Sequence, residues 1–390
     1  MTRSLASVAA GLLPVLLLAA GCENDPASPS NARPDVRVFA GGLHTCALTA
    51  DGALYCWGAN SLGQLGDGSR TDRASPVPVV GGRTYSDAVA GDGHTCAIAT
   101  DGTAYCWGWA NFGIVGDSVR RDDQRDAPQP EPVRVAGGHT FRVLGAGSTH
   151  TCGIDPGGAG YCWGFGGGDG RLGNDGFIAY APTPIEGGLD LAAVDGGEQH
   201  SCGLTAAGRA YCWGDNRAQQ LGARLLSPNR DVPVAVAGGL SFRRIAAGAF
   251  HTCALDRSGR AYCWGYGMEG QLGRGIADNA DAPVRVDGGL TFRAVAAGRA
   301  HTCALTSAGR AYCWGDNEAG QLGDGTLEPR PTPVAVATET TFAWISAGGR
   351  HTCASTDDGA IYCWGDGSNG QLGQGSTASS SFPVRVGAPF

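Results

Sequence analysis

The sequence contains no lysine, so all 28 of its basic side chains are arginines. Aspartate and glutamate outnumber them at 36, which leaves a formal net charge of −8 at neutral pH. Nucleic acids and anionic membrane surfaces are bound through clustered basic side chains. We therefore expect no nucleic-acid partner and no direct contact of the folded domain with a membrane.

Sequence signatures of catalysis are absent as well. There is no Ser-His-Asp order typical of hydrolases, no nucleophile elbow and no glycine-rich phosphate loop. A pair of catalytic carboxylates needs no such signature and stays open, because acidic residues are numerous. We expect a protein that is not an enzyme and that holds no cofactor.

Cysteine, in contrast, is abundant and regularly placed. Fourteen of the 15 cysteines form seven pairs with a constant spacing of ten residues. The pairs are Cys46-Cys56, Cys96-Cys106, Cys152-Cys162, Cys202-Cys212, Cys253-Cys263, Cys303-Cys313 and Cys353-Cys363. Their first members lie 50 or 51 residues apart, except for one gap of 56. A period of this size indicates a repeat architecture.

Each pair lies in a predicted β-hairpin. In the sixth copy the strands are His301–Leu305 and Ala311–Trp314, and Gly309 ends a three-residue loop at the place where a left-handed residue is needed. Counting back from this tip places Cys303 opposite Cys313 at a Cα separation of about 4.5 Å, within disulfide range. We expect seven disulfides, a framework typical of exported proteins.

The sixth unit predicts two further strands, at Phe292–Ala297 and Pro333–Val336. In the hairpin, Thr, Ala and Tyr share one face while Leu and both Cys share the other, so that both faces are largely apolar. A sheet that is apolar on both faces and is repeated seven times fits a propeller, in which every blade lies between two neighbours. The predicted fold class is all-β, a seven-bladed β-propeller of four-stranded blades over residues 35–390.

The links between units lead to a prediction about ring closure. Val286 and Phe292 flank a tight Asp-Gly-Gly link, which suggests that each Pro-Val-x-Val strand pairs with the strand after it. The last such strand, Pro383–Val386, is then expected to pair with Val36–Ala40 and to complete the first blade.

The N-terminal segment does not contain the repeat and has the composition of a targeting sequence. Residues 1–21 carry Arg3 and an apolar run that ends in small residues, which is typical of a signal peptide. The run Leu18-Ala19-Ala20-Gly21-Cys22 resembles a bacterial lipobox, in which the cysteine is acylated; an ordinary cleavage site beside a chance cysteine is the alternative. Residues 22–34 are rich in Pro and Ser and predict a flexible tether. We expect a protein of the bacterial cell envelope that is lipid-anchored through Cys22, on the periplasmic or the surface side of the outer membrane, and that touches the membrane only through this lipid.

The repeat itself points to a family. Its pattern reads AGxxHTCALxxxGxxYCWGxxxxGQLG, and GQLG stands intact at Gly63–Gly66, Gly270–Gly273, Gly320–Gly323 and Gly370–Gly373. This pattern resembles the regulator-of-chromosome-condensation repeat, and the resemblance implies a seven-bladed propeller. It implies little about activity, because the family includes nucleotide-exchange factors, a plant ultraviolet photoreceptor, ubiquitin ligases and a secreted bacterial β-lactamase inhibitor. The paired cysteines depart from the family pattern and fit an oxidising compartment.

Repeated histidines and tryptophans are expected to be structural. Seven of the eight histidines stand two positions before the first cysteine of a pair, and seven tryptophans follow the second cysteine. A residue that recurs at the same position of every blade is typically structural. We expect the histidines to form hydrogen bonds and the tryptophans to pack between blades. We predict no metal site, because His-x-Cys lacks the spacing of zinc ligands and the Asp-Gly pairs lack the clustered acids of calcium loops.

Two positions differ from repeat to repeat. After the repeated Trp-Gly stand Ala59, Trp109, Phe165, Asp215, Tyr266, Asp316 and Asp366, and before the repeated His stand Leu43, Gly93, Thr149, Gln199, Phe250, Ala300 and Arg350. Both positions lie at the hairpin end opposite the Gly tip, so they share one rim. Aromatic and Arg side chains that vary on one rim are typical of a partner-binding surface, although tolerant loop positions would vary too. The residues predicted for this surface are Trp109, Phe165, Tyr266, Phe250, Met268, Arg299 and Arg350, with the charged insertion at 118–131 as a second candidate.

Together these features predict a non-catalytic, monomeric module of the cell envelope that presents a loop rim to a protein partner. The alternative is a secreted hydrolase or lyase with a site at the mouth of the central channel, and a third possibility is a passive scaffold. Convergent carboxylates or histidines at that mouth would favour the enzyme, whereas an apolar rim edged by arginines would favour binding.

Overall fold

The computed structural model describes residues 36–121 and 127–389. The expected signal peptide, Cys22 and the tether lie outside these residues, and the insertion at 118–131 lies partly outside them. No helix in the described part of the chain is long and apolar enough to cross a membrane.

The described residues form seven antiparallel four-stranded sheets, each built from four consecutive strands. Blades one and two comprise β1 (Val36–Ala40), β2 (His44–Thr49), β3 (Leu54–Gly58), β4 (Arg73–Pro78), β5 (Tyr85–Ala90), β6 (His94–Ala99), β7 (Ala104–Trp109) and β8 (Pro128–Arg134), with a short 3₁₀ turn η1 (Asn111–Gly113) after β7. Blades three and four comprise β9 (Val143–Ala146), β10 (His150–Ile154), β11 (Gly160–Phe165), β12 (Ile178–Pro184), β13 (Leu191–Gly196), β14 (His200–Thr205), β15 (Ala210–Asp215) and β16 (Asn229–Ala235).

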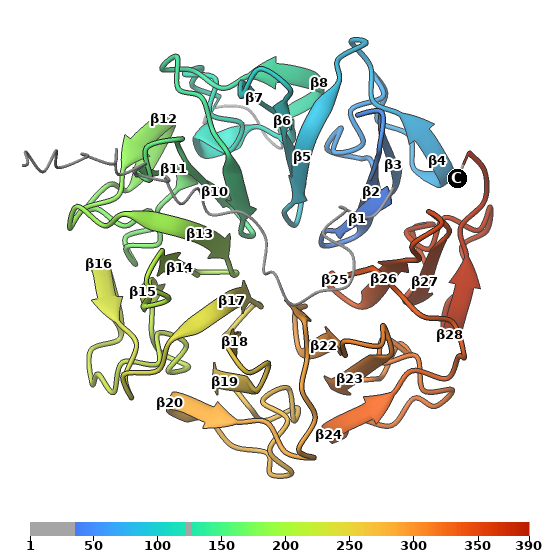
Figure 1. The fold of residues 1–390 in the computed structure, drawn as a ribbon. Coiled ribbons are helices and arrows are strands. Elements are labelled where there is room, and N and C mark those ends of the chain that lie inside the picture. Colours follow the sequence, from blue (N-terminus) through green and yellow to red (C-terminus); the bar gives the residue numbers. More distant parts are fainter. Residues whose placement is uncertain (1–35, 122–126, 390) are drawn as a thin grey trace, which may run out of the picture. The chain divides into compact units, whose positions relative to one another are not determined.

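Blades five to seven comprise β17 (Phe242–Ala247), β18 (His251–Asp256), β19 (Ala261–Gly265), β20 (Ala280–Arg285), β21 (Ala294–Ala297), β22 (His301–Leu305), β23 (Ala311–Gly315), β24 (Arg330–Ala335), β25 (Trp344–Ala347), β26 (His351–Ser355), β27 (Ile361–Gly365) and β28 (Ser380–Arg385). The first strand of each blade is innermost and the fourth is outermost (Figure 1). The predicted seven-bladed propeller is confirmed.

The predicted hairpin register is also present. Cys303 pairs with Cys313 and Ala304 with Tyr312, and Gly309 has a φ of +77° at the tip. Seven disulfides join the second and third strands of their blades, with Cα separations of 4.0 to 4.1 Å. The fourth strand of this blade begins at Arg330, three residues earlier than predicted.

The prediction about ring closure is wrong. The last strand, β28, pairs with β27 alone, and β1 pairs with β2 alone, so the two ends of the described chain share no sheet. The tight links do not imply pairing with the next blade, because the residues on both sides of a link are hydrogen-bonded to the blade that precedes it. Val286 N–H donates to Ala261 O at 3.0 Å and Phe292 N–H to Gly259 O at 2.7 Å, both within blade five.

Blades one and seven instead meet face to face, as the other neighbours do. Trp57, Leu372 and Val386 pack together between the two sheets. Side chains of blade seven also reach the first strand: Trp344 Nε1–H donates to Val38 O at 2.9 Å, and Ser355 Oγ–H to Val36 O at 2.6 Å. Buried apolar area and a few such bonds close the ring.

Candidate functional site

The strand register defines two rims. His44 pairs with Gly58, and Gly58 pairs with Arg73, so the connections from first to second strand and from third to fourth strand lie on one side. We call this side the His-side rim. The hairpin tips and the links between blades lie on the other side, the Gly-tip rim. The variable positions that the sequence singles out all lie on the His-side rim.

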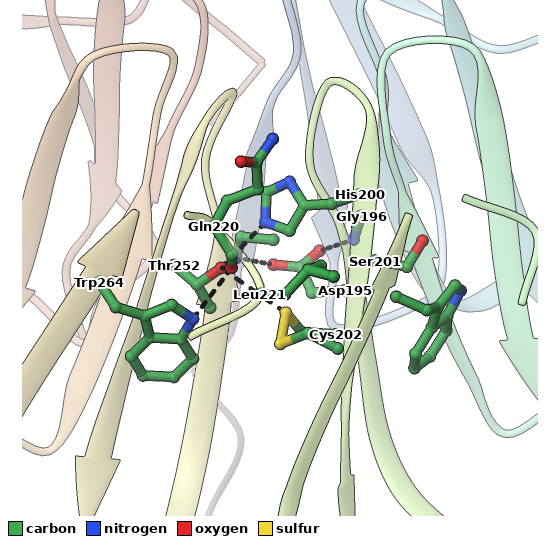
Figure 2. The surroundings of a disulfide bond; sticks show 12 residues. Asp195, Gly196, His200, Ser201, Cys202, Gln220, Leu221, Thr252 and Trp264 are labelled. Carbon is green, nitrogen blue, oxygen red and sulfur yellow. Dashed lines mark hydrogen bonds between the residues drawn. A yellow bond between two sulfur atoms is a disulfide. The ribbon is translucent and has the colours of Figure 1, made fainter. Parts of the chain in front are cut away.

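The seven repeated histidines form a closed ring of hydrogen bonds between blades. Each is bonded through Nε2 to a hydroxyl oxygen in the next blade, at 2.7 to 2.9 Å. Figure 2 shows one junction, where Thr252 accepts from His200 and donates to Gln220 O at 3.2 Å. Trp264 Nε1–H donates to the same carbonyl at 3.0 Å. The histidines and tryptophans therefore join neighbouring blades.

This arrangement sets the state of the imidazoles. Thr252 has one hydroxyl proton and gives it to Gln220 O, so it accepts from His200 Nε2–H. Nδ1 of His200 then carries a lone pair and is buried without a partner. Burial, together with the charge of Arg171, lowers the pKa of His200 to about 3. The ring is neutral at physiological pH and serves structure.

Glycines before these histidines let the blades approach at the channel mouth. A Cβ on Gly91 would lie 2.3 Å from His94 Cε1 and 2.5 Å from Gly147 O, closer than any side chain tolerates. The mouth is a small hollow of about 90 Å³, and its charged lining residues are Asp92, Glu198 and Arg299. No histidine lines this hollow among the described residues.

Deeper in the channel stands Asp195. Its carboxylate accepts from Gly196 N–H and from Ala247 N–H in the next blade, both at 3.0 Å. Asp195 lines the channel, and burial raises its pKa to about 6. Because both oxygens are engaged by backbone donors, this carboxylate joins two blades.

Three of the predicted surface residues come together. Phe250, Tyr266 and Arg299 line one hollow of about 630 Å³ on the His-side rim, between blades four, five and six. Its other wall carries Asp215 and Arg217, joined by an ion pair at 2.6 Å. The volume lies in the range of ligand pockets.

Two other predicted residues belong to a separate aromatic cluster on blades two and three. Ring centroids lie 6.4 Å apart for Trp109 and Phe112, 5.1 Å for Phe112 and Phe165, and 5.5 Å for Phe165 and Phe177. Phe177 is exposed, while the other three are half-buried. The seven predicted residues thus do not form one continuous patch.

The remaining two predicted residues lie apart. Met268 is exposed on blade five beside the hollow without lining it. Arg350 pairs with Glu318 at 2.9 Å on the surface. Of the predicted insertion, Arg121 pairs with Asp117 at 2.6 Å.

Only part of a set of exposed apolar residues was anticipated from the sequence: Met268, Leu43 and the insertion that contains Val119 were named, but not the others. The large hydrophobic side chains that are exposed in the connections of the described chain all lie on the His-side rim: Leu43, Val119, Phe177, Leu226, Met268, Ile276 and Leu327. Five of them lie three or four residues after the GQLG-type turn of blades two to six. This recurrence is visible in the sequence, but their exposure is not, because a loop apolar residue is as readily buried.

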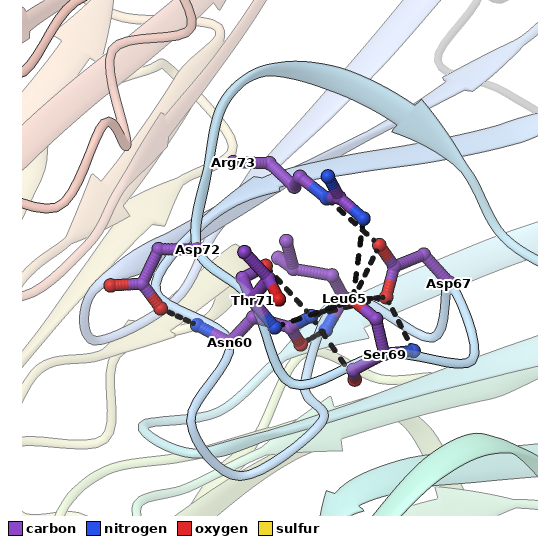
Figure 3. A network of polar contacts seen from close by, with 7 residues as sticks. All are labelled: Asn60, Leu65, Asp67, Ser69, Thr71, Asp72 and Arg73. Atoms are coloured by element: carbon purple, nitrogen blue, oxygen red, sulfur yellow. Dashed lines mark hydrogen bonds and ion pairs between the residues drawn. The ribbon is translucent and has the colours of Figure 1, made fainter.

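The acidic residues after GQLG are used within the loop. In Figure 3, Asp67 accepts from Asn60 Nδ2–H and Arg73 Nε–H, each at 3.1 Å. Although burial acts to raise the pKa of Asp67, hydrogen bonds from Ser69 and Arg73 lower it overall. Amide and guanidinium donors around the carboxylate make this a structural turn.

The fold and the repeat define the class of protein. A family model described as RCC1-like domain matches residues 169–389, more than half of the chain. Models of the regulator of chromosome condensation (RCC1) repeat match residues 51–98, 36–64 and 86–114. The chain belongs to the RCC1-like domain family.

Two curated relatives are similar to this chain over short segments. The Arabidopsis thaliana ultraviolet-B receptor UVR8 is 51% identical over 43 residues, which are 11% of this chain and 10% of the receptor. The human probable E3 ubiquitin-protein ligase HERC3 is 45% identical over 58 residues, 14% of this chain and 6% of the ligase. The chain spans about a tenth or less of the length of these relatives.

Solved structures share the fold over most of their length. Human WBSCR16 superposes with a TM-score of 0.74 at 22% identity, covering 81% of this chain and 85% of that one. The structure of Kap60 bound to yeast RCC1 (Prp20) also gives 0.74 at 22% identity, with 86% and 83% covered. Identities this low establish the fold alone.

Proposed function

We propose that this propeller is a binding module for another protein, with the His-side rim as its contact surface. The observation that carries the proposal is that the large apolar side chains exposed in the connections of the described chain all lie on this rim. Leu226, Ile276 and Leu327, on three successive blades, are 104%, 53% and 58% exposed. Exposed apolar side chains gathered on one face of a soluble domain are typical of an interaction surface.

The path of the chain supports the same rim. Val36 pairs with Thr49 near a hairpin tip, and Arg385 pairs with Tyr362, so both ends of the described chain lie at the Gly-tip rim. Neither end of the described residues therefore lies on the His-side rim. The His ring favours binding over catalysis, because its imidazoles are neutral, buried and used between blades.

Relatives support a protein as the partner. The solved complex that resembles this chain is described as Kap60 bound to yeast RCC1, and a structure of Prp20p is described with its binding to Gsp1p and histones. Those partners are properties of the yeast protein. The proposal for this chain takes from them only that a propeller of this fold serves as a platform for protein binding.

Capture of envelope proteins by the immobilised domain tests the proposal. The rim variant carries Leu226→Ser, Ile276→Ser and Leu327→Ser, and the control carries Val232→Ser and Phe382→Ser in the outer strands, where the exposed fractions are 39% and 52%. We expect parent and control to capture the same protein and the rim variant to lose it, with thermal melting unchanged. Equal capture by the rim variant would assign binding to another surface.

We further propose that the protein is lipid-anchored in the cell envelope through Cys22. This rests on the lipobox-like run before Cys22, the single cysteine without a partner in the repeat. A tether of about 13 residues spans at most about 45 Å when fully extended.

Replacement of the anchor cysteine tests this second proposal. We expect Cys22→Ser to release the protein from the membrane fraction or to leave the precursor unprocessed. Unchanged processing and membrane association would exclude the lipid. Cys46→Ala with Cys56→Ala serves as the control for removal of cysteine as such, and membrane association should survive it.

A further inference from the structure

A carboxylate recurs at the His-side rim in blades four, six and seven. In blade six, Asp316 accepts from Gln321 Nε2–H at 2.7 Å and from Glu318 N–H at 3.0 Å. Asp366 in blade seven accepts from Gln371 Nε2–H and Ser368 N–H, both at 3.0 Å. One amide side chain and one backbone N–H therefore form a small carboxylate-binding site inside the chain.

Blade five keeps the donors but lacks this carboxylate. Tyr266 stands where Asp316 stands in blade six, and Gln271 corresponds to Gln321. Gln271 still accepts from Glu269 N–H through Oε1 at 3.0 Å. Its Nε2 and the N–H of Met268 have no acceptor among the described residues. Gln271 is 1% exposed and lines the hollow between blades four and six.

Other groups around the hollow extend this pair of donors. Arg299 lies in the opposite wall with a side chain that is 61% exposed, and its nearest acid, Glu198, is 3.9 Å away. Phe250 and Tyr266 supply apolar surface. The acids of the lining are Glu269 and Asp215, and Asp215 is already bonded to Arg217 and Gln220. The Gln271 amide without an acceptor, a guanidinium and aromatic rings thus share one hollow, with the N–H of Met268 beside it.

We propose that this hollow binds a carboxylate that stands next to a large apolar side chain in a peptide segment of the partner. The ligand carboxylate takes the place of the aspartate that blade five lacks, accepts from Gln271 Nε2–H and pairs with Arg299. The apolar side chain packs on Phe250 and Tyr266. The chain's own use of the same donors for Asp316 and Asp366 is the model for this recognition. This inference rests on the proposed function and names the chemistry of its partner.

A methionine methyl group reports binding directly. The chain has two methionines, Met1 and Met268. Labelling with methyl-¹³C methionine therefore gives two methyl signals in the full chain and one after removal of residues 1–21, and the variant Met268→Leu assigns the signal of Met268. The probes are N-acetyl-Phe-Asp-amide and its neutral isostere N-acetyl-Phe-Asn-amide. We expect the Asp peptide to shift the Met268 signal saturably and the Asn peptide to bind at least about tenfold more weakly, as for loss of a charged hydrogen-bond acceptor. Equal binding of the two peptides, or no saturable shift with either, overturns the proposal.

Two variants with matched controls test the residues. Tyr266→Asp supplies the missing carboxylate from the chain itself and should abolish peptide binding without lowering the melting temperature. Gln271→Glu keeps the acceptor oxygen but replaces the donor NH₂ with a second, negatively charged acceptor oxygen, and should abolish binding too. The controls are Ala59→Asp and Gln64→Glu at the same repeat positions of blade one, where Gln64 Oε1 also accepts a loop N–H at 3.0 Å. Both controls should bind the Asp peptide as the parent does.

The outcomes separate this inference from the function on which it rests. Binding by Tyr266→Asp as tight as that of the parent overturns the carboxylate site, while capture of the partner through the apolar rim still stands. Selective binding of the Asp peptide, together with unchanged capture by the Leu226, Ile276 and Leu327 variant, supports the hollow and rejects the wider rim. If Tyr266→Asp melts well below the parent, its loss of binding is not informative, and peptide binding by Gln271→Glu decides instead.

Discussion

His351 in the last blade lies 2.9 Å from Thr45 in the first, between Nε2 and Oγ1. Thr45 in turn donates to Gln371 O at 2.9 Å, and Trp57 Nε1–H donates to the same carbonyl at 2.9 Å. The junction between the two ends of the described chain thus has the same bonds as the internal junction at Thr252 and Trp264. Closure needs no strand exchanged between blades, because one interface is repeated around the ring.

Substitution of the hydroxyl on each side of the ring tests this closure. We expect Thr45→Val to leave the N–H of His351 buried without an acceptor, at a cost of about 1–3 kcal/mol in the free energy of unfolding. Thr252→Val makes the same change at an internal junction and should cost about as much. Chemical denaturation of both variants provides the measurement. A much smaller cost for Thr45→Val would mean that the ring is open at this junction in solution.

The histidine ring also predicts loss of stability in acid. Burial lowers the pKa of His44, His251, His301 and His351 to about 3 and that of His94 to about 4. An unfolded chain protonates its histidines near pH 6.5, so below this pH it binds more protons than the folded chain. Stability should therefore fall as pH drops from about 6.5 toward 3, by up to about 1.4 kcal/mol per pH unit for each histidine.

One group in the channel acts in the opposite direction. The raised pKa of Asp195, about 6, contributes stability at low pH that is lost as pH rises from about 4 to 6. The effect of this one carboxyl on the free energy of unfolding is smaller than the opposite effect of the seven histidines. Melting temperatures measured from pH 7.5 to 4.5, together with proton uptake on unfolding, check the prediction. Stability that stays flat or rises on acidification would contradict the neutral, buried ring.

Much of the fold could be predicted because the repeat is local. The spacing from Cys303 to Cys313 and the glycine at position 309 set the hairpin register within a few residues of chain. The strand that closes the ring could not be predicted in this way. Its partner depends on where a link turns in space, and the bonds of Val286 and Phe292 to blade five are not visible in their own residue types.

The candidate site, like the fold, could be predicted from the sequence only in part. That Phe250, Tyr266 and Arg299 share a rim follows from equivalent positions in successive repeats, but their common hollow depends on the packing of three blades. The free amide of Gln271 had a sequence signal: an Asp stands five residues before the Gln at 215 and 220, at 316 and 321, and at 366 and 371. Tyr266 departs from that pattern. Only the hydrogen bonds of the structure show that the Gln amide of each such pair donates to the Asp carboxylate.

The junction between blades two and three should be less strongly bonded than its neighbours. Blade two has Gly113-Ile114-Val115-Gly116 in place of GQLG, and Trp163 Nε1 is buried without a partner. The equivalent Trp213 Nε1–H donates to Arg171 O at 3.0 Å. We expect Trp163→Phe to lower the free energy of unfolding by about 0.5–1.5 kcal/mol less than Trp213→Phe does, since only the second loses a hydrogen bond. Equal losses would mean that Trp163 has a partner in solution.

The disulfides are expected to be seven, each within its own blade. All fourteen cysteines of the pairs are fully buried, so a reductant should not reach them in the native state. Closing a ten-residue loop stabilises a fold by about 2–3 kcal/mol in the chain-entropy model, and by less where the hairpin is already formed. We expect Cys303→Ala with Cys313→Ala to lower the free energy of unfolding within that limit, and the other six bridges to form as before.

Non-reducing peptide mapping of the native protein tests the pairing within each blade. The same mapping after exposure of the native protein to dithiothreitol tests whether the bridges resist reduction. The same mapping after unfolding in the presence of dithiothreitol is the control, because every bridge should then be lost together. Bridges between different blades, or free thiols in the native oxidised protein, would contradict the pairing. Selective reduction of one bridge in the native state would instead identify a blade that opens on its own, and the junction at Trp163 makes blade three the first one to examine.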